Sequence, residues 1–249
     1  HKKNSHASPT PVLDRDRLFV HFGPVGTACM TTDGEVVWKM SELKFKPVHG
    51  NGGSPALHGD TLLVTCDGAD KQFVAGIAAS TGKVQWTTER SADVRKGFSF
   101  CTPTLIEVNG RSQAICPGSG AVAAYDPDSG EALWSVDYGE GYSIVPRPVY
   151  GKGLVFVSSC YDSATLYAID PTGSGDVTDS HVRWTIDRGV PKTPSMLVID
   201  DELYFVDDGG VASCVDALTG KPHWKKRLGG KYSSSLFYGA GFVYFQSET

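Results

Sequence analysis

The chain has 249 residues, and its 29 glycines and 14 prolines are too many for a helical bundle or a long coiled coil. A formal net charge of −5 argues against a nucleic-acid partner, and a hydrophobic fraction of 40 % excludes a disordered chain. No apolar run reaches the length of a transmembrane helix, so the composition indicates a β-rich globular protein.

The five tryptophans recur at intervals of 40–50 residues, and four of them follow a Gly-x-x-x-Trp pattern. The instances are Gly34…Trp38, Gly82…Trp86, Gly130…Trp134 and Gly220…Trp224, with His181-Val-Arg-Trp184 as a variant. A second marker precedes each Trp by about 30 residues: Ser8-Pro9, Ser54-Pro55, Thr102-Pro103, Arg147-Pro148 and Thr193-Pro194. Two markers in phase predict a structural repeat.

Each repeat resolves into four short runs of β-forming residues separated by Gly and Asp turns. In the second repeat the runs are Ser54–Leu57, Thr61–Val64, Phe73–Ala78 and Lys83–Trp86. Four antiparallel strands repeated every 40–50 residues are typical of β-propeller blades. We therefore predict an all-β propeller forming a single domain over residues 1–249, with blades at about 6–40, 53–88, 100–136, 144–186 and 192–226 and a partial sixth at 232–249.

The two markers have a physical use in such blades. A lone four-stranded sheet cannot cover both of its faces, so each blade must pack against its neighbours. A Trp on the last strand can fill the space between blades, and a Pro suits the innermost strand, where an N–H would have no partner. The chain ends inside its sixth unit, which predicts a piece of a larger ring.

Residues Ala124–Trp134 and Cys214–Trp224 follow the pattern Ala-x-Asp-x-x-Thr-Gly-x-x-x-Trp almost position by position. In this the chain resembles the PQQ-like repeat β-propellers, and it is most similar to the bacterial extracytoplasmic proteins grouped with BamB. The resemblance implies a ring of seven or eight blades and a non-enzymatic, periplasmic scaffold for a protein or peptide partner. It also implies peripheral membrane association through an N-terminal region that precedes these residues.

Two alternatives stay open: a quinone- or metal-dependent oxidoreductase, and a propeller that binds a small ligand. The dehydrogenases that the chain resembles carry an adjacent Cys-Cys pair over the cofactor and a calcium site with acidic and amide ligands. This chain has no adjacent cysteines and only three asparagines, Asn4, Asn51 and Asn109, so PQQ and calcium are disfavoured. Its six cysteines include no CxxC pair, and we expect them to be small apolar residues of strands.

The propeller topology predicts where a binding site lies. The loops between second and third strands share a face with the loops that join successive blades, and function tends to be carried by such loops. The candidate residues for a ligand or partner on this face are His49, Asn51, Asp67, Asp70, Arg147, Tyr161 and Asp162. The alternative interpretation is solvated turns with local Asx-type hydrogen bonds.

Two further charged segments are less specific. The fourth repeat carries an insertion, Asp170–His181, whose carboxylates Asp170, Asp176 and Asp179 could ligate calcium. Its spacing differs from that of an EF-hand, so we expect a hydrophilic hairpin extension on the opposite face. Lys44, Lys46, Arg90, Arg95 and Lys96 form a basic cluster that we expect to be a solvated rim.

Overall fold

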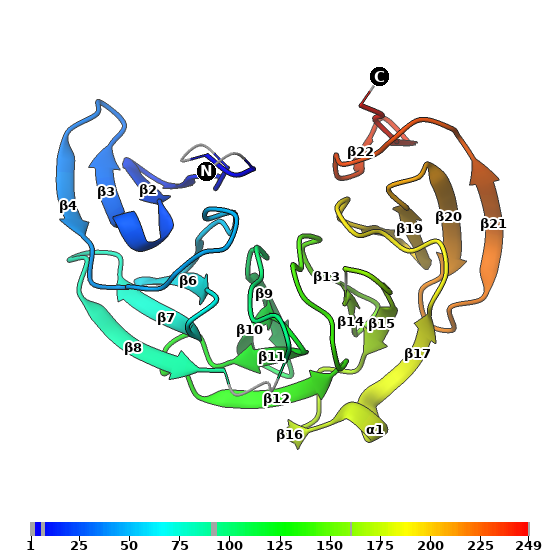
Figure 1. Ribbon diagram of the computed structural model, residues 1–249, viewed down its shortest axis with the longest axis horizontal. Helices are drawn as coiled ribbons and strands as arrows, with labels where there is room; N and C mark the ends of the chain where they lie inside the picture. Colours follow the sequence, from blue (N-terminus) through cyan, green and yellow to red (C-terminus); the bar gives the residue numbers. More distant parts are fainter. Residues whose placement is uncertain (1–2, 6–7, 91–93, 160, 249) are drawn as a thin grey trace.

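The computed structural model describes residues 3–5, 8–90, 94–159 and 161–248. These residues form a series of antiparallel sheets in chain order, arranged as an open arc with the two chain ends on either side of its gap (Figure 1). Five sheets contain a four-stranded meander, and the last has two strands. The predicted propeller with five full blades and a partial sixth is therefore confirmed. The number of blades in a closed ring stays a prediction.

The first three blades are built as follows. Blade 1 contains β1 (Val12–Asp14), β2 (Arg17–His21), the 3-10 turn η1 (Gly23–Val25), β3 (Thr27–Thr31) and β4 (Val36–Met40). Blade 2 contains β5 (Ala56–His58), β6 (Thr61–Asp67), β7 (Gln72–Ala78) and β8 (Val84–Glu89). Blade 3 contains β9 (Thr104–Val108), β10 (Arg111–Pro117), β11 (Ala121–Tyr125) and β12 (Ala132–Asp137).

The remaining blades repeat the meander. Blade 4 contains β13 (Val149–Gly151), β14 (Leu154–Ser158), β15 (Leu166–Ile169) and β17 (Val182–Ile186), with β16 (Gly175–Asp176) and the short helix α1 (Thr178–His181) inserted before β17. Blade 5 contains β18 (Leu197–Ile199), β19 (Glu202–Val206), β20 (Val211–Asp216) and β21 (Pro222–Arg227). The sixth sheet pairs β22 (Phe237–Gly239) with β23 (Phe242–Tyr244).

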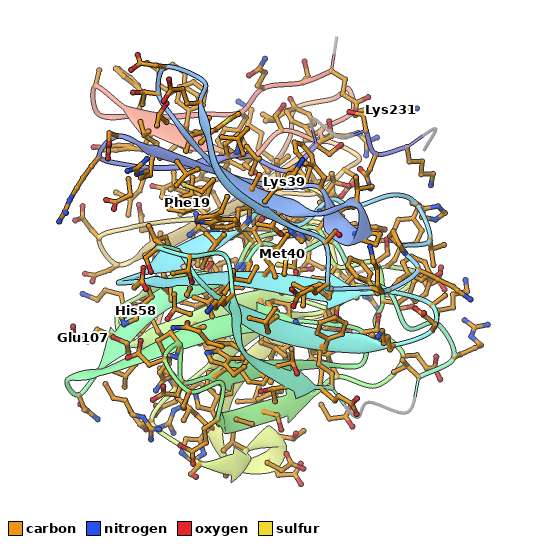
Figure 2. All side chains as sticks on the ribbon, turned by 90° about the vertical axis from the view of Figure 1, so that its left-hand side faces the viewer. Phe19, Lys39, Met40, His58, Glu107 and Lys231 are labelled. Atoms are coloured by element: carbon orange, nitrogen blue, oxygen red, sulfur yellow. The ribbon has the colours of Figure 1, made fainter. Side chains whose placement is uncertain are left out.

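The meander gives the arc an inner side, an outer rim and two faces. The fourth strands β4, β8, β12, β17 and β21 follow the outer rim, and the first strands lie inside (Figure 1). We call the side with the connections between second and third strands and between blades the loop face, and the other side the turn face. Figure 2 separates the two: the turns of His58 and Glu107 lie on one side, and Lys231, from the connection between blades 5 and 6, lies on the other.

The hydrophobic core lies between the blades. Val155 and Val157 of blade 4 pack against Val122 and Val136 of blade 3, and all four are almost fully buried. Equivalent clusters join blades 1 and 2 and blades 4 and 5. Each blade thus buries its apolar faces against its neighbours, as the quasi-linear repeat requires.

The Gly-x-x-x-Trp motif works between neighbouring blades. The ring of Trp38 in blade 1 packs on Gly82 of blade 2, where an added Cβ would lie 2.6 Å from Trp38 Cε3. The Trp38 Nε1–H donates a hydrogen bond of 2.8 Å to the carbonyl of Ala79 in the same turn. Trp86 likewise contacts Gly130, and Trp184 contacts Gly220. Gly82, Gly130 and Gly220 therefore each receive the Trp of the preceding blade, whereas Trp224 of blade 5 is 41 % exposed.

The hydroxyl-Pro marker has a different register at two blades. The residue two positions before each first strand is Thr10 in blade 1 and Ser195 in blade 5, rather than Ser8 or Thr193. The sequence contains Pro9 and Pro11 on both sides of Thr10, so it does not say which proline precedes the strand. The strand pairing identifies the register in blade 1. Val12 pairs with Phe19 in the way that Ala56 pairs with Leu63 in blade 2, so Thr10 is the equivalent of Ser54.

The insertion in blade 4 is an arm that crosses to blade 3, not a plain hairpin extension. Its strand β16 pairs in parallel with β12, the outermost strand of blade 3 (Figure 1). Val177 is 2 % exposed and belongs to the core between blades 3 and 4, and its N–H bonds the carbonyl of Ser135. The hydrophilic composition of the segment does not predict this packing, because Val177 is the one valine in it that joins the core.

The five described cysteines, at positions 29, 66, 101, 116 and 214, are free and buried. They behave as the small apolar residues that the sequence predicts, and Cys160 lies outside the described residues. Over the described part of the chain, no helix has the length and hydrophobicity that a bilayer crossing requires.

Candidate functional site

The loops of neighbouring blades are joined on the loop face. The Lys46 N–H, in the connection between blades 1 and 2, donates to Asp70 Oδ1 in blade 2 at 2.8 Å. The Ala69 N–H returns a bond of 2.9 Å to the Lys46 carbonyl. Further round, the Gly120 N–H of blade 3 bonds the carbonyl of Gly141, before blade 4. The face is therefore a connected surface.

Two of the predicted site residues have local structural roles there. Asp70 holds the Lys46 backbone, as described, so its carboxylate ties two loops together. Asn51 donates from its side-chain nitrogen to the carbonyl of Gly53 at 3.3 Å, and its Cβ packs where Gly23 has no side chain. These are the local turn contacts that the alternative interpretation describes.

Asp67 is buried beneath the loop face and does not project from it. It is the last residue of β6, all of whose residues are buried. Its Oδ1 lies 3.4 Å from Arg90 Nε, and the two side chains are 1 % and 7 % exposed. Burial raises the pKa of Asp67, and the Arg90 guanidinium opposes that effect. Arg90 is thus no part of a solvated rim, and its Nη1 donates to the carbonyl of Cys116 in blade 3.

Tyr161 and Asp162 do lie together on the exposed part of the face. The Tyr142 hydroxyl donates to Asp162 Oδ2 at 3.1 Å, and the two tyrosine rings are 6.0 Å apart. Lys96 Nζ lies 4.4 Å from the Tyr142 ring centroid and donates to its hydroxyl at 2.9 Å. We call the following group the tyrosine–cation cluster: Arg95, Lys96, Tyr142, Tyr161, Asp162 and Lys192.

The two other cations bind the same small loop. Arg95 Nη2 lies 3.8 Å from Asp162 Oδ2, with 66 % of its side chain exposed. Lys192 Nζ donates to the Asp162 carbonyl at 2.8 Å and lies 5.6 Å from the Tyr161 ring centroid. Asp162 adopts a φ of +65°, a conformation that these contacts hold in place.

His49 belongs to a row of aromatic rings that supports this cluster. Its ring lies 5.4 Å from Phe98, edge to face, and 6.1 Å from Phe100, stacked. Phe98 in turn contacts Tyr142 at 5.5 Å. Because Phe98 and Tyr142 are buried, the row forms a fixed base that runs from the connection before blade 2 to the one before blade 4.

Arg147 lies away from the cluster, at the inner side of the arc. Its Nε donates to Thr104 Oγ1 at 3.0 Å, and its side chain lines a cavity of about 450 Å³ between the first strands. The structure therefore brings together Tyr161 and Asp162, connects His49 to them through aromatic rings, and separates the other candidates.

Sequence reasoning missed the aromatic residues of the cluster and the cation Lys192. Phe98, Phe100 and Tyr142 occur in irregular segments that have no strand period, so no pattern assigns them to a face. Their signal is the density of aromatic residues in Gly-containing connections, where loops are otherwise polar. Arg95 and Lys96 lie on the exposed rim that the sequence predicts, but the sequence does not indicate that Lys96 contacts Tyr142 and that Arg95 contacts Asp162.

The described residues contain no group of three or more His, Cys, Asp or Glu side chains that could hold a metal. In the inserted arm, Asp170 accepts from Thr172 and Asp176 accepts from Thr178, so both carboxylates close local turns. The residues that line the inner cavity include no carboxylate and no side-chain amide, so they do not match the oxygen ligands of a calcium ion.

Comparison with known proteins gives one family and one fold. The family model described as outer membrane protein assembly factor BamB matches residues 21–109, 118–178 and 176–249. A sequence search finds no significant match among curated proteins. Among solved structures, BamB from Moraxella catarrhalis is similar over 95 % of this chain, with a TM-score of 0.67 and 17 % identity.

A quinohemoprotein alcohol dehydrogenase from Pseudomonas putida HK5 is also similar, over 88 % of this chain, with a TM-score of 0.62 and 15 % identity. This chain covers 66 % of the Moraxella protein and 42 % of the Pseudomonas enzyme. At these identities the two structures establish the propeller fold alone, because the same blades carry different functions.

Proposed function

The chain belongs to the BamB family of PQQ-like repeat β-propellers, and from that premise we propose that it is a scaffold that binds a protein or peptide partner through its loop face. The family description names an outer membrane protein assembly factor. By extension we propose that this chain takes part in such assembly, that it acts in the periplasm and that it associates peripherally with the membrane.

The tyrosine–cation cluster is the observation that carries the proposal. Tyr161 is 49 % exposed, and the Arg95 side chain, which is paired with the neighbouring Asp162, is 66 % exposed. Tyrosine and arginine dominate the binding energy of protein interfaces, because each offers a large contact area together with polar groups. The buried rings of Phe98 and Tyr142 hold this surface in one arrangement, which reduces the entropy lost on binding.

The charges around the cluster indicate what the partner presents. The cluster holds three cations, of which Lys192 lies over the Tyr161 ring and Lys96 over the Tyr142 ring. The third, Arg95, is paired with Asp162 and Glu140, and Asp162 also accepts from Tyr142. A partner segment with a carboxylate beside an apolar side chain would match this surface. Such rim charges act mainly on the association rate and on specificity.

A site-specific photo-crosslink tests the proposal. A photoreactive phenylalanine analogue replaces Tyr161 in the protein expressed in its source cells, and the same analogue replaces Thr185 on the outer strand β17 as a matched control. We expect a discrete protein adduct from position 161 that is absent from position 185. The double variant Arg95→Ala, Lys96→Ala should reduce that adduct at least about tenfold, since it removes the charge that orients the partner. Equal adducts from both positions, or an adduct unaffected by the double variant, would contradict a loop-face binding site.

The oxidoreductase alternative has its own test. The lining of the inner cavity favours the scaffold, because it offers no carboxylate or amide oxygen for calcium. A visible quinone absorption band in the purified protein, together with calcium-dependent dehydrogenase activity, would replace the scaffold proposal with an enzymatic one.

A further inference from the structure

A series of hydroxyl groups joins successive blades at the inner side of the arc. The Thr10 N–H donates to Ser54 Oγ at 2.8 Å, and the Ser54 N–H donates to Thr102 Oγ1 at 3.0 Å. On the other side of blade 4, the Ser195 N–H donates to Ser235 Oγ at 3.1 Å. Blades 2, 3, 5 and 6 thus each present a small hydroxyl residue, two positions before the first strand, to the backbone of the preceding blade.

Blade 4 breaks this series with an arginine. Arg147 occupies the position of Ser54 and Thr102, although its own N–H still donates to Ser195 Oγ at 3.0 Å. The backbone relation between blades is therefore kept, and the substitution changes only what projects into the inner side. Nothing in the packing of the first strands requires a guanidinium there, because Ser or Thr serves the equivalent blades.

The Arg147 side chain is held so that its end remains available. Its Nε donates to Thr104 Oγ1, and that hydroxyl donates in turn to the carbonyl of Pro148 at 2.9 Å. The two terminal nitrogens of the guanidinium form no hydrogen bond and no ion pair with any described residue. A fixed guanidinium with a free pair of N–H groups is the geometry that binds an oxyanion with two parallel hydrogen bonds.

The surrounding cavity supplies a complementary environment. It has a volume of about 450 Å³, within the range of small-molecule sites. The residues that line it are Thr10, Pro11, Val12, Ser54, Pro55, Ala56, Leu57, Thr102, Leu105 and Arg147. Arg147 is the one charged group in this lining, so the site carries a positive charge inside a protein whose formal net charge is −5.

Two hydroxyls of the lining can add hydrogen bonds to an anion. Ser54 Oγ and Thr102 Oγ1 each accept an N–H, as described, and neither donates its proton to a described residue. Their protons can therefore turn toward a bound acceptor. The cavity thus combines a fixed cation, hydroxyl donors and the apolar walls of Val12, Leu57 and Leu105.

We propose that this inner cavity binds a carboxylate that is attached to an apolar group. The terminal nitrogens of Arg147 bind the carboxylate, and the hydroxyls of Ser54 and Thr102 donate hydrogen bonds to it. A carboxylate matches the planar fork of the guanidinium, and the apolar walls favour an attached hydrocarbon or aromatic group. Two sources share this chemistry: a free organic acid, and an acidic side chain of a protein segment that enters the inner side. The site is separate from the tyrosine–cation cluster, so this proposal can be tested independently of the loop-face proposal.

Titration with benzoate tests the site. The protein, labelled with ¹⁵N at arginine, is titrated at constant ionic strength while the Arg147 Nε–H resonance is followed, with benzamide as the neutral isostere. We expect a saturable shift with benzoate, with a dissociation constant of about 1 mM or tighter, and no saturable shift with benzamide. A capped Glu-Leu dipeptide amide provides the second arm: tighter binding than benzoate assigns the site to a protein side chain, and weaker binding assigns it to a free acid.

Arg147→Ser provides the matched variant, because it restores the hydroxyl type found in the equivalent blades and should fold. In uniformly ¹⁵N-labelled protein, benzoate binding followed on backbone amides near Ser54 should be at least about tenfold weaker in this variant than in the wild type. Arg227→Ser, on the outer strand β21, removes an arginine elsewhere and should leave binding unchanged. Equal benzoate affinity of the wild type and Arg147→Ser, or equal shifts with benzamide and benzoate, would overturn the proposal. Binding of chloride or phosphate as tight as that of benzoate would overturn the assignment to a carboxylate.

Discussion

Asp67 and Arg90 form an ion pair inside the contact between blades 2 and 3, with Oδ1 and Nε 3.4 Å apart. Neither atom completes a hydrogen bond with a described residue, and both side chains are more than nine-tenths buried. Removing two charges from water costs several kcal/mol per ion, so the pair holds the blades together only while both partners are present. Among the ion pairs of the described residues, this is the one in which both side chains are buried, so we expect their contributions to stability to be coupled.

Removal of one partner should therefore cost more than removal of both. Arg90→Met leaves the Asp67 carboxylate buried without a cation, and we expect the free energy of unfolding to fall by about 3–5 kcal/mol. The double variant Asp67→Leu, Arg90→Met should be more stable than Arg90→Met alone. Urea unfolding at pH 7 measures both variants, and a double variant that is the less stable of the two would contradict the coupling.

The same pair gives a pH signature. Burial raises the pKa of Asp67, and Arg90→Met removes the cation that opposes this. A carboxyl whose folded-state pKa lies above its unfolded value favours the fold below the unfolded value and loses that contribution as the pH rises. The difference in unfolding free energy between the wild type and Arg90→Met should therefore become smaller as the pH falls from 7 toward 4. A deficit that is constant over that range would show that the lost packing of the arginine, and not the buried charge, causes the instability.

The turn glycines allow packing against tryptophan to be measured separately from backbone conformation. Gly82 has a φ of +76° and lies against Trp38, whereas Gly110 has a φ of +77° and nothing within 4 Å of an added Cβ. Gly110→Ala should cost about 1 kcal/mol, from the left-handed conformation alone. Gly82→Ala should cost about 1–3 kcal/mol more, because its methyl group would meet the indole ring. Thermal or urea unfolding of the two variants gives the difference, and equal costs would rule out a packing role for Gly82.

The packing of tryptophan on the turn glycines explains why the blades could be predicted from the sequence. The Gly and the Trp must keep their spacing from one blade to the next, because the indole rings of Trp38, Trp86 and Trp184 occupy the places where Gly82, Gly130 and Gly220 have no side chain. The hydroxyl-Pro marker was less secure at blades 1 and 5, where neighbouring prolines and hydroxyl residues offer two registers. Only the pairing of β1 with β2 and of β18 with β19 distinguishes them.

The candidate site was visible in part, for a different reason. Topology alone places His49, Tyr161 and Asp162 on the loop face, because it depends on strand order and not on side chains. It could not show that Asp67 turns inward, since a carboxylate at a strand end looks the same whether or not an arginine from the next connection covers it. Likewise the contact between Phe98 and Tyr142 joins residues 44 positions apart that have no common pattern.

His21 should make the protein less stable in mild acid. It is 2 % exposed, its Nδ1 lies 2.9 Å from Thr27 Oγ1, and burial lowers its pKa from 6.5 to about 4. The neutral ring is thus favoured in the fold, so its contribution is complete above pH 6.5 and is lost as the pH falls to about 4. The free energy of unfolding should fall by about 3 kcal/mol through this group. His21→Gln cannot titrate, so the wild type minus variant difference in unfolding free energy should change over this interval. A flat difference would show that His21 does not titrate on unfolding.

The inserted arm should stabilise the outer edge of blade 3. Val177 is buried between blades 3 and 4, its N–H bonds the Ser135 carbonyl, and the Thr178 hydroxyl accepts the Asp137 N–H at 2.9 Å. Val177→Ala removes two buried methyl groups and should cost about 1–2.5 kcal/mol. Because β16 covers β12 locally, we expect the Asp137 amide to exchange faster with solvent in the variant, while amides of the equivalent outer strand β8 keep their rates. Val84→Ala, on β8 itself, is the matched control and should produce the reverse pattern. If Val177→Ala accelerates exchange equally in both strands, the arm acts on global stability and not on the edge of blade 3.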